Sequence, residues 1–315
     1  MTVDVLIPAY RPDRRFARLL QMLSKQTVKP RRIIVVNTEE SYWNEEGYKG
    51  IRGLEVHHVT KAEFDHGGTR NLAAWYSEAE IMIFMTQDAV PQDEYLIEEL
   101  LKAFEQTGPH GEVIAQAYAR QLPAKNCHLI ERLTRDFNYP DQPMVKTKAD
   151  LERLGIKTYF ASNVCCAYRK DIFEAREGFI TSTIFNEDMI YAGGIIQDGY
   201  AIAYVSSAKV IHSHNLSPLE QFHRNFDMAV SQADHPEVFD GLPSEGEGIR
   251  LVKQTAVKLM KKGRFWLIPS LIVSSGCKYL GYRMGKKYRS LPRKVILWCS
   301  MSPAYWERRW KERQA

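Results

Sequence analysis

The sequence lacks the features that mark exported and membrane-spanning proteins. Its first residues, MTVDVLIPAY, have neither the charged start nor the apolar core of a signal peptide. No apolar run reaches the roughly 18–20 residues that a helix needs to cross a bilayer. The five cysteines are an odd number without regular spacing, which indicates neither a disulfide framework nor a zinc site. We therefore expect a cytoplasmic protein in which Cys165 and Cys166 are core residues.

Acidic residues are almost missing from the C-terminal part of the chain. Residues 250–315 hold 17 Lys and Arg against 2 Asp and Glu, whereas residues 1–249 hold 26 against 36. The net charge of +5 conceals this asymmetry. A basic segment on an acidic body predicts an anionic partner, which can be a membrane surface, a nucleic acid or an acidic substrate.

Short apolar runs that end in polar residues recur along the first part of the chain. Such runs suit strands buried on both faces of a parallel sheet, and the helical spacing between them indicates covering helices. We expect an α/β fold, a Rossmann-like, mostly parallel sheet with helices on both faces, followed by a basic, mainly helical C-terminal region. Strands are predicted at residues 3–8, 32–36, 54–59, 81–85, 113–118, 159–168, 201–205 and 208–212, and helices at 14–26, 72–78 and 94–105.

The connecting segments also carry predictions. Pro8–Tyr10 is predicted as the loop that leaves the first strand, and Pro91 as the start of a helix. Residues 123–158, which are polar and irregular, are predicted as an active-site flap or a mobile segment. Residues 233–249 are rich in Pro, Gly and acidic groups and are predicted as a linker. This divides the chain into a catalytic domain of residues 1–232, the linker, and a basic tail of residues 250–315.

The run Ile81–Met85 breaks abruptly into Thr86-Gln87-Asp88. A buried parallel strand directs its carboxyl end to the crevice where open α/β sheets bind ligands. Asp88 is therefore expected beside a nucleotide and its metal ion. The alternative is that Asp88 only helps to turn the chain ahead of Pro91.

Five polar clusters follow one another in a recognisable order: Pro8-Ala9-Tyr10, Asn37–Glu40, FDHGGTRN at 64–71, TQDA at 86–89, and Glu187-Asp188. This order resembles that of family 2 glycosyltransferases, which are inverting enzymes of the GT-A fold that use nucleotide-sugar donors. The late His-Ser-His segment at 212–214 makes the chain most similar to the bacterial rhamnosyltransferases of that family. The resemblance covers roughly residues 3–230.

The resemblance implies three sets of site residues. Asp188 would be the general base, in a catalytic pair with Glu187. A divalent cation, Mg²⁺ or Mn²⁺, would be held by Asp88 together with His212 or His214. The donor-binding residues would be Pro8, Ala9, Tyr10, Thr38, Glu39, Gly67, Gly68, Arg70, Gln87 and Asp88.

The reaction requires these residue types. A nucleoside diphosphate is a poor leaving group until a cation neutralises its developing charge, and the acceptor hydroxyl needs a base. The chain keeps one carboxylate of the family's D-x-D signature, since that segment reads Thr86-Gln87-Asp88. Structural roles are the alternatives: a helix N-cap for Asp188, and satisfied structural histidines for His212 and His214.

The resemblance also implies the substrates. The enzyme would transfer a deoxysugar, L-rhamnose from dTDP-L-rhamnose, to a hydroxyl of a lipid-linked precursor of a cell-surface polysaccharide. The basic tail, with Trp and Tyr beside its cations, is expected to lie on an anionic membrane at the inner face of the cell membrane. Helices that simply pack on the catalytic domain are the alternative for the tail.

Nucleic acid is a further candidate partner for the basic tail, and two other functions are alternatives. Nucleic acid is not expected as a partner, because no recognised binding motif accompanies the charge. A nucleotidyltransferase that acts on a sugar phosphate shares a similar sheet and metal carboxylate. A catalytically inactive membrane-surface scaffold is favoured only by the incomplete D-x-D signature.

Overall fold

The computed structural model describes residues 1–242 and 245–312. The chain divides into two compact units. The first, which we call the sheet unit, consists of residues 1–125, 139–181 and 187–213. The second, which we call the helical unit, consists of residues 126–138, 182–186 and 214 to the C-terminus.

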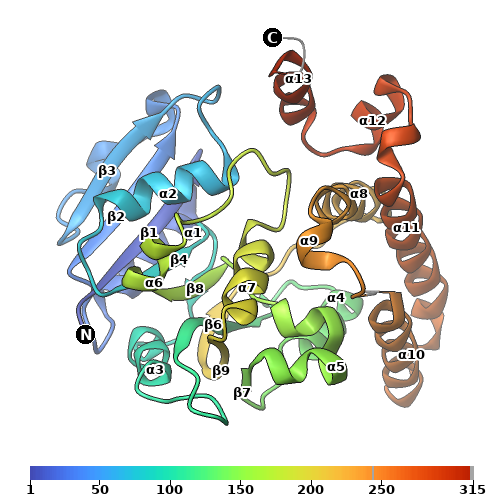
Figure 1. Cartoon of the computed structure of the whole chain (residues 1–315), viewed down its shortest axis with the longest axis horizontal. Coiled ribbons are helices and arrows are strands. Elements are labelled where there is room, and N and C mark those ends of the chain that lie inside the picture. Colours follow the sequence, from blue (N-terminus) through green and yellow to red (C-terminus); the bar gives the residue numbers. More distant parts are fainter. Residues whose placement is uncertain (243–244, 313–315) are drawn as a thin grey trace. The chain divides into compact units, whose positions relative to one another are not determined.

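The sheet unit is built on one mixed sheet with the strand order β3-β2-β1-β4-β8-β6-β9-β5, and β7 pairs with β9 (Figure 1). Strands β3, β2, β1 and β4 run parallel, whereas β8 runs antiparallel to both β4 and β6. The strands are β1 (Val3–Tyr10), β2 (Arg32–Thr38), β3 (Leu54–Val59), β4 (Ile81–Met85), β5 (Val90–Pro91), β6 (Ile114–Leu122), β7 (Met144–Lys146), β8 (Cys165–Arg169) and β9 (Ala201–Ile211).

Helices cover both faces of this sheet, which confirms the predicted fold class. Phe16 of α1 packs with Val5 of β1 on one face. Because neighbouring strand residues point to opposite faces, Phe84 of β4 lies on the other face, where its ring is 5.8 Å from that of Phe173 in α6. The helices of this unit are α1 (Arg14–Ser24), α2 (His66–Tyr76), α3 (Leu96–Ala103), α5 (Leu151–Leu154), α6 (Lys170–Ala175) and α7 (Glu187–Gln197), with 3₁₀ turns η1 (Glu40–Tyr42), η2 (Glu45–Tyr48), η3 (Lys148–Asp150) and η4 (Gly155–Tyr159).

Two predicted connections are wrong. Pro8–Tyr10 is not a loop but continues β1, because it pairs with residues 36–38 of β2. Pro91 does not open a helix but lies in the short strand β5, paired with Val210. This strand is at the edge of the sheet, where the missing N–H of proline is tolerated.

The prediction that residues 123–158 form an irregular flap is also wrong, because they contain α4 (Leu129–Asn138), β7 and α5. Leu133 on the apolar side of α4 is 3% exposed and packs with Leu259 and Leu271. Two strand predictions also need correction. The segment 159–168 begins as the end of a 3₁₀ turn and becomes a strand only at Cys165, and residues 201–211 form one strand with a register shift instead of two strands.

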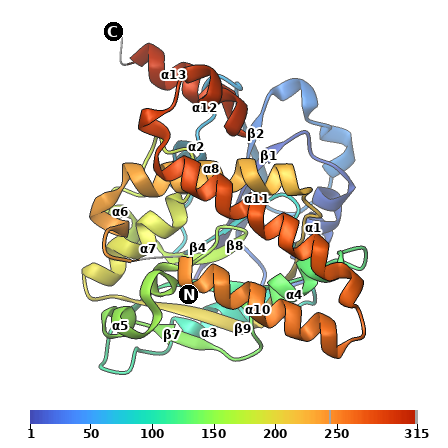
Figure 2. The same ribbon diagram turned by 90° about the vertical axis from the view of Figure 1, so that its right-hand side faces the viewer.

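The helical unit contains α4 and the helices that follow β9 (Figure 2). Its helix α11 lies directly against α8. A Cβ on Gly281 would meet the carbonyl oxygen of Phe222 at 2.2 Å, and one on Gly285 would meet that of Phe226 at 2.3 Å, so both glycines are needed for this approach. The helices are α8 (Pro218–Asp234), α9 (Pro236–Phe239), α10 (Glu245–Lys261), α11 (Ile268–Lys286), α12 (Arg293–Cys299) and α13 (Pro303–Glu312), with turns η5 (Phe265–Leu267) and η6 (Tyr288–Ser290).

The predicted linker of residues 233–249 includes the end of α8, all of α9 and the start of α10, and its residues 243 and 244 lie outside the described residues. The division into a catalytic domain of residues 1–232 and a tail of residues 250–315 stays a prediction. Within residues 1–242 and 245–312, we find no helix with the length and apolar character needed to cross a bilayer.

Candidate active site

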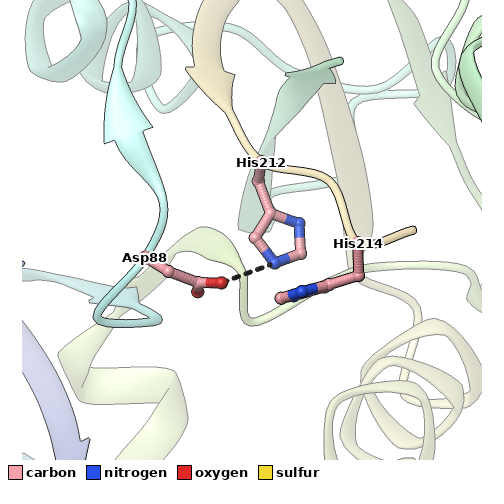
Figure 3. Close-up of side chains that lie close together, drawn as sticks. All are labelled: Asp88, His212 and His214. Carbon is pink, nitrogen blue, oxygen red and sulfur yellow. Dashed lines mark ion pairs between the residues drawn. The ribbon is translucent and has the colours of Figure 1, made fainter. Parts of the chain in front are cut away.

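The carboxyl end of β4 leads to the first of two polar clusters. Asp88 lies three residues beyond this strand, and its side chain is 15% exposed. Its Oδ2 is 3.6 Å from Nε2 of His212, the residue that follows β9. One ligand atom from each of Asp88, His212 and His214 lies within 4.8 Å of the others (Figure 3). The structure thus brings the three predicted metal ligands together.

A cationic side chain also faces Asp88. Nη1 of Arg15, in the first turn of α1, is 3.7 Å from Asp88 Oδ2. The same guanidinium bonds Asp13, the N-cap residue of α1, at 3.1 Å. Since the Arg15 side chain is 57% exposed, solvent screens its attraction to Asp88. Arg15 therefore places a positive charge near the cluster without filling it.

The second cluster is built at the start of α7, whose first two residues are Glu187 and Asp188. The backbone N–H of Asn163 donates to Asp188 Oδ2 at 3.0 Å, and its side-chain Nδ2 donates to Glu187 Oε1 at 3.2 Å. Nη1 of Arg70 is 3.2 Å from the same Glu187 oxygen. Glu187 and Arg70 are 7% and 6% exposed, so this ion pair is shielded from water.

The two adjacent carboxylates have different proton affinities. Burial raises the pKa of Asp188 to about 7, and the negative charge of Glu187 adds to the rise. Burial would also raise the pKa of Glu187, but the charges of Arg70 and His66 outweigh it and lower that pKa below its ordinary value. The residue as a whole is half-buried and not sealed from solvent. One carboxylate thus stays ionised while the other exchanges its proton near neutral pH, as a general base requires.

Asp88 and Asp188 are both anchored where the carboxyl end of β4 meets the start of β8. The carboxyl end of β4 adjoins the start of β8 in the antiparallel pair. Just beyond β4, the N–H of Thr86 donates to the carbonyl oxygen of Val164 at 3.1 Å. The neighbouring residue, Asn163, holds Asp188. The two loops that carry or fix these carboxylates are therefore hydrogen-bonded to each other.

The end of β1 lies beside the same loop. The side-chain amide of Gln87 pairs with the backbone of Tyr10: it accepts from the Tyr10 N–H at 2.8 Å and donates to the Tyr10 carbonyl at 2.9 Å. Tyr10 is 38% exposed, and its ring meets the Tyr42 ring edge-on at 5.6 Å. Exposed aromatic rings at strand ends offer a stacking surface for a nucleobase.

Other predicted donor residues lie near the ends of β1 and β2. Ala9 and Thr38 are each 3% exposed, and Pro8 is half-buried in β1. Within the described residues, Thr38 Oγ1 has no hydrogen-bond partner. Glu39 adopts a left-handed φ of 66° and accepts from the N–H of Lys61. A buried hydroxyl without a partner is where a ligand contact would be expected.

The predicted glycine segment forms the first turn of α2. Asp65 caps this helix by accepting from the Gly68 N–H at 2.8 Å. A Cβ on Gly67 would meet the carbonyl oxygen of Ile180 at 1.9 Å, so packing alone requires glycine there. Contact of either glycine with a donor stays a prediction.

Comparison with known proteins identifies the family. Residues 4–176 match the family model described as Glycosyl transferase family 2. The chain belongs to glycosyltransferase family 2. It is 38% identical to the O-antigen chain rhamnosyltransferase RfbN of Salmonella typhimurium, over 97% of this chain and 96% of RfbN. It is 36% identical to the O-antigen chain rhamnosyltransferase WbaN of Salmonella anatum, over 96% of this chain and 95% of WbaN.

Solved structures share the fold of this family 2 enzyme. The complex of S. aureus TarS 1–349 with UDP-GlcNAc superposes with a TM-score of 0.52 at 16% identity and covers 92% of each chain. The mannosyltransferase PcManGT from Pyrobaculum calidifontis, in complex with GDP-Man and Mn²⁺, gives 0.55 at 13% identity over 96% of this chain and 86% of that one. The predicted GT-A fold and the predicted glycosyltransferase activity are confirmed, whereas the role of each site residue stays a prediction.

Sequence reasoning missed three polar residues at these clusters, namely Arg15, Gln121 and Asn163. Arg15 occupies an exposed position on a helix, where a charged residue is ordinary. Gln121 and Asn163 act through hydrogen bonds to residues far away in the chain, which no spacing rule indicates. The only signal in the sequence was their position: Gln121 lies near the end of β6, and Asn163 lies just before β8.

Proposed function

We propose that this family 2 enzyme transfers L-rhamnose from dTDP-L-rhamnose to a hydroxyl of a cell-surface polysaccharide precursor, with inversion at the sugar carbon. The observation that carries this proposal is the similarity to two O-antigen chain rhamnosyltransferases over nearly the whole chain. The positions of Asp88 and Asp188 at one sheet edge support a single displacement between a donor diphosphate and an acceptor hydroxyl.

Asp188 is the proposed general base. With its pKa raised to about 7, it is ionised in much of the enzyme at neutral pH and is still basic enough to take a hydroxyl proton. Glu187 stays ionised beside Arg70 and orients Asn163, whose N–H fixes one oxygen of Asp188. The acceptor oxygen loses its proton to Asp188 as it bonds to the sugar carbon, and the bond from that carbon to the diphosphate breaks.

The residues around Asp88 fit a divalent cation. One carboxylate oxygen and two imidazole nitrogens within 4.8 Å of one another form a mixed oxygen and nitrogen ligand set. Such a set suits a first-row transition ion such as Mn²⁺ better than Mg²⁺, which prefers oxygen ligands. The ion, when bound, neutralises charge on the leaving diphosphate. We propose that His212 and His214 replace the carboxylate that the chain lacks at Thr86.

The donor base is proposed to lie at the end of β1. Tyr10 and Tyr42 expose ring surface there, and the buried hydroxyl of Thr38 is available for a polar contact. Gln87 fixes the backbone of Tyr10 and lies next to Asp88 in the chain, so one segment connects the base site to the diphosphate site.

We further propose that the helical unit binds the inner face of the cell membrane, where a lipid-linked acceptor would be presented. Helix α11 exposes an apolar stripe on the side away from α8. Its members recur at helical spacing and are 52–66% exposed in the described chain, unlike Leu271 at 4% on the packed side. The stripe, with the turn that precedes it, consists of Phe265, Trp266, Ile272, Val273, Tyr279 and Leu280.

The charge around this stripe favours an anionic lipid surface. Residues 250–306 contain no Asp or Glu, so no carboxylate of this segment repels a phosphate headgroup. Exposed cations lie at both ends of the stripe: Lys261, Lys262 and Arg264 at one end, and Arg283, Lys286 and Lys287 at the other. Each Lys or Arg near such a surface contributes about 1 kcal/mol, and aromatic rings prefer the headgroup level.

The function is tested by incubating the full-length protein with dTDP-L-rhamnose, Mn²⁺ and lipid-linked glycan extracted from a strain that lacks the enzyme. We expect release of dTDP and a glycan heavier by one deoxyhexose. UDP-GlcNAc and GDP-mannose serve as control donors and are expected to stay intact. Transfer from a control donor only would contradict the choice of sugar. Release of pyrophosphate from dTTP and a sugar phosphate would favour the nucleotidyltransferase alternative.

A further inference from the structure

Gln121 is a buried glutamine at the end of β6 whose amide links the candidate cation site to the sheet. It is 3% exposed and lies one residue before the end of its strand. Its Nε2 donates to the hydroxyl oxygen of Tyr139 at 2.6 Å and to that of Ser162 at 3.1 Å. Its Oε1 is 3.0 Å from Nδ1 of His212. All three contacts lie within the sheet unit.

The direction of these contacts favours one of the two neutral forms of the His212 ring. An amide NH₂ has two donors and no acceptor, and here both donors are directed at hydroxyl oxygens. With the amide in this orientation its carbonyl oxygen faces His212 Nδ1, and an oxygen acceptor pairs with a proton on that nitrogen. In the neutral ring, Nε2 then keeps its lone pair.

That lone pair points to a second acceptor. His212 Nε2 is 3.6 Å from Asp88 Oδ2, which is beyond hydrogen-bond distance. The pair is drawn as an ion pair in Figure 3, and it is attractive when a positive charge accompanies it, either a proton on Nε2 or a cation held between the two atoms. Metal-bound histidines commonly donate their other N–H to a partner that fixes the ring in this way.

We propose that Gln121 is a positioning residue that holds His212 in the Nδ1–H form, so that Nε2 is presented as a metal ligand opposite Asp88. The inference rests on the proposed function, because it assigns a partner to the proposed cation site. Gln121 itself touches neither donor nor acceptor in this scheme. Its effect reaches the reaction only through the orientation and protonation pattern of one histidine.

The strand offers a matched control in Gln116. It is also fully buried on β6, and its amide bonds the hydroxyl of Tyr168 at 2.9 Å. Tyr168 in turn donates to Asn163, on the side of Asp188 and not of Asp88. A general loss of packing would affect Gln116→Met and Gln121→Met alike, whereas loss of a histidine partner affects only the second.

The test combines nitrogen NMR of the histidine rings with Mn²⁺ titration, both on the full-length chain. In ¹⁵N-histidine-labelled protein, with His212→Gln used for assignment, we expect the Nδ1–H form for His212. Gln121→Met is expected to weaken Mn²⁺ binding about 10- to 100-fold, the usual effect of removing such a partner. We expect Gln121→Glu to bind Mn²⁺ nearly as the parent does, because it keeps an oxygen facing Nδ1. We expect the same of the control Gln116→Met.

Each result decides a separate point. An Nε2–H form of His212 in the parent protein would overturn the inference, whatever the variants do. The inference can therefore be tested even if Gln121→Met fails to fold. Parental Mn²⁺ affinity in folded Gln121→Met would overturn it as well. If the parent bound no Mn²⁺ in the presence of dTDP, the proposed cation site itself would fail, and the inference would fall with it.

Discussion

Nη1 of Arg70 lies 3.2 Å from Oε1 of Glu187, and both side chains are almost fully buried. This ion pair gives two neighbouring carboxylates different tasks. Glu187 stays ionised beside Arg70 and accepts a hydrogen bond from Asn163, whereas Asp188 carries the raised pKa. In the proposed mechanism the glutamate is a support for the base and not a second base.

Glu187→Gln should therefore destabilise the protein. The substitution leaves the guanidinium of Arg70 buried opposite a neutral amide, and breaking a buried pair by removing one partner costs about 3 kcal/mol or more. Urea unfolding monitored by circular dichroism measures the change. Glu78→Gln is the control: that glutamate also pairs with an arginine, Arg31, but is 78% exposed, so little change is expected. Equal midpoints for both variants would contradict a supporting role.

The rate of transfer should depend on pH through Asp188. Its pKa is raised to about 7 by burial and by the charge of Glu187, so the protonated, inactive form predominates below that pH. With saturating donor, the rate should fall about tenfold for each pH unit below the pKa and level off above it. In Glu187→Gln the midpoint should move to lower pH, because the neighbouring negative charge is gone. A rate that is flat from about pH 5 to pH 8 would rule out this assignment.

Gln87 should act on donor binding through Tyr10. Replacing it with Ala removes both hydrogen bonds to the Tyr10 backbone, each with a net contribution of about 1 kcal/mol. We expect the KM for the donor to rise about tenfold, with a smaller effect on kcat. Gln87→Glu is the matched variant, since its carboxylate still accepts from the Tyr10 N–H but repels the Tyr10 carbonyl. An unchanged KM in both variants would show that the two hydrogen bonds between Gln87 and Tyr10 do not organise the donor site.

Membrane binding should depend on the rings of the turn η5, just before α11. We expect the double variant Phe265→Ala and Trp266→Ala to lose most sedimentation with anionic vesicles, because two exposed rings at the headgroup level are removed. Trp75→Ala is the control, since Trp75 is 75% exposed but belongs to α2 of the sheet unit. Sedimentation of the parent should weaken with added salt. If the double variant sedimented like the parent, this stripe would not be the lipid-binding surface.

Much of the sheet could be predicted because its strands are apolar on both faces. Residues 54–59 and 81–85 were predicted as strands and coincide with β3 and β4. Helix α4 was not predicted, because the apolar partners of its Leu133 are Leu259 and Leu271, which lie more than a hundred residues later in the chain. The approach of His212 to Asp88 could be anticipated only from the family's motif order, not from spacing.

The hydrogen bonds that support Asp188 and His212 could not be predicted from the sequence, for a different reason. Whether Asn163 meets Asp188 depends on where the start of α7 packs beside the start of β8. Whether Gln121 meets His212 depends on the register of β9 against β6. A shift by one residue would turn these side chains to the other face. Register is a property of the folded sheet, and the pattern of apolar residues does not specify it to the last residue.

The most direct test of the account is the single-turnover rate of sugar transfer by Asp188→Asn, measured with saturating dTDP-L-rhamnose and Mn²⁺. The account predicts donor binding like that of the parent and a transfer rate lower by about 10²- to 10⁴-fold, because only the base is lost. Asp88→Asn should instead weaken Mn²⁺-dependent donor binding. Transfer by Asp188→Asn at the parental rate would contradict the central claim that this carboxylate deprotonates the acceptor.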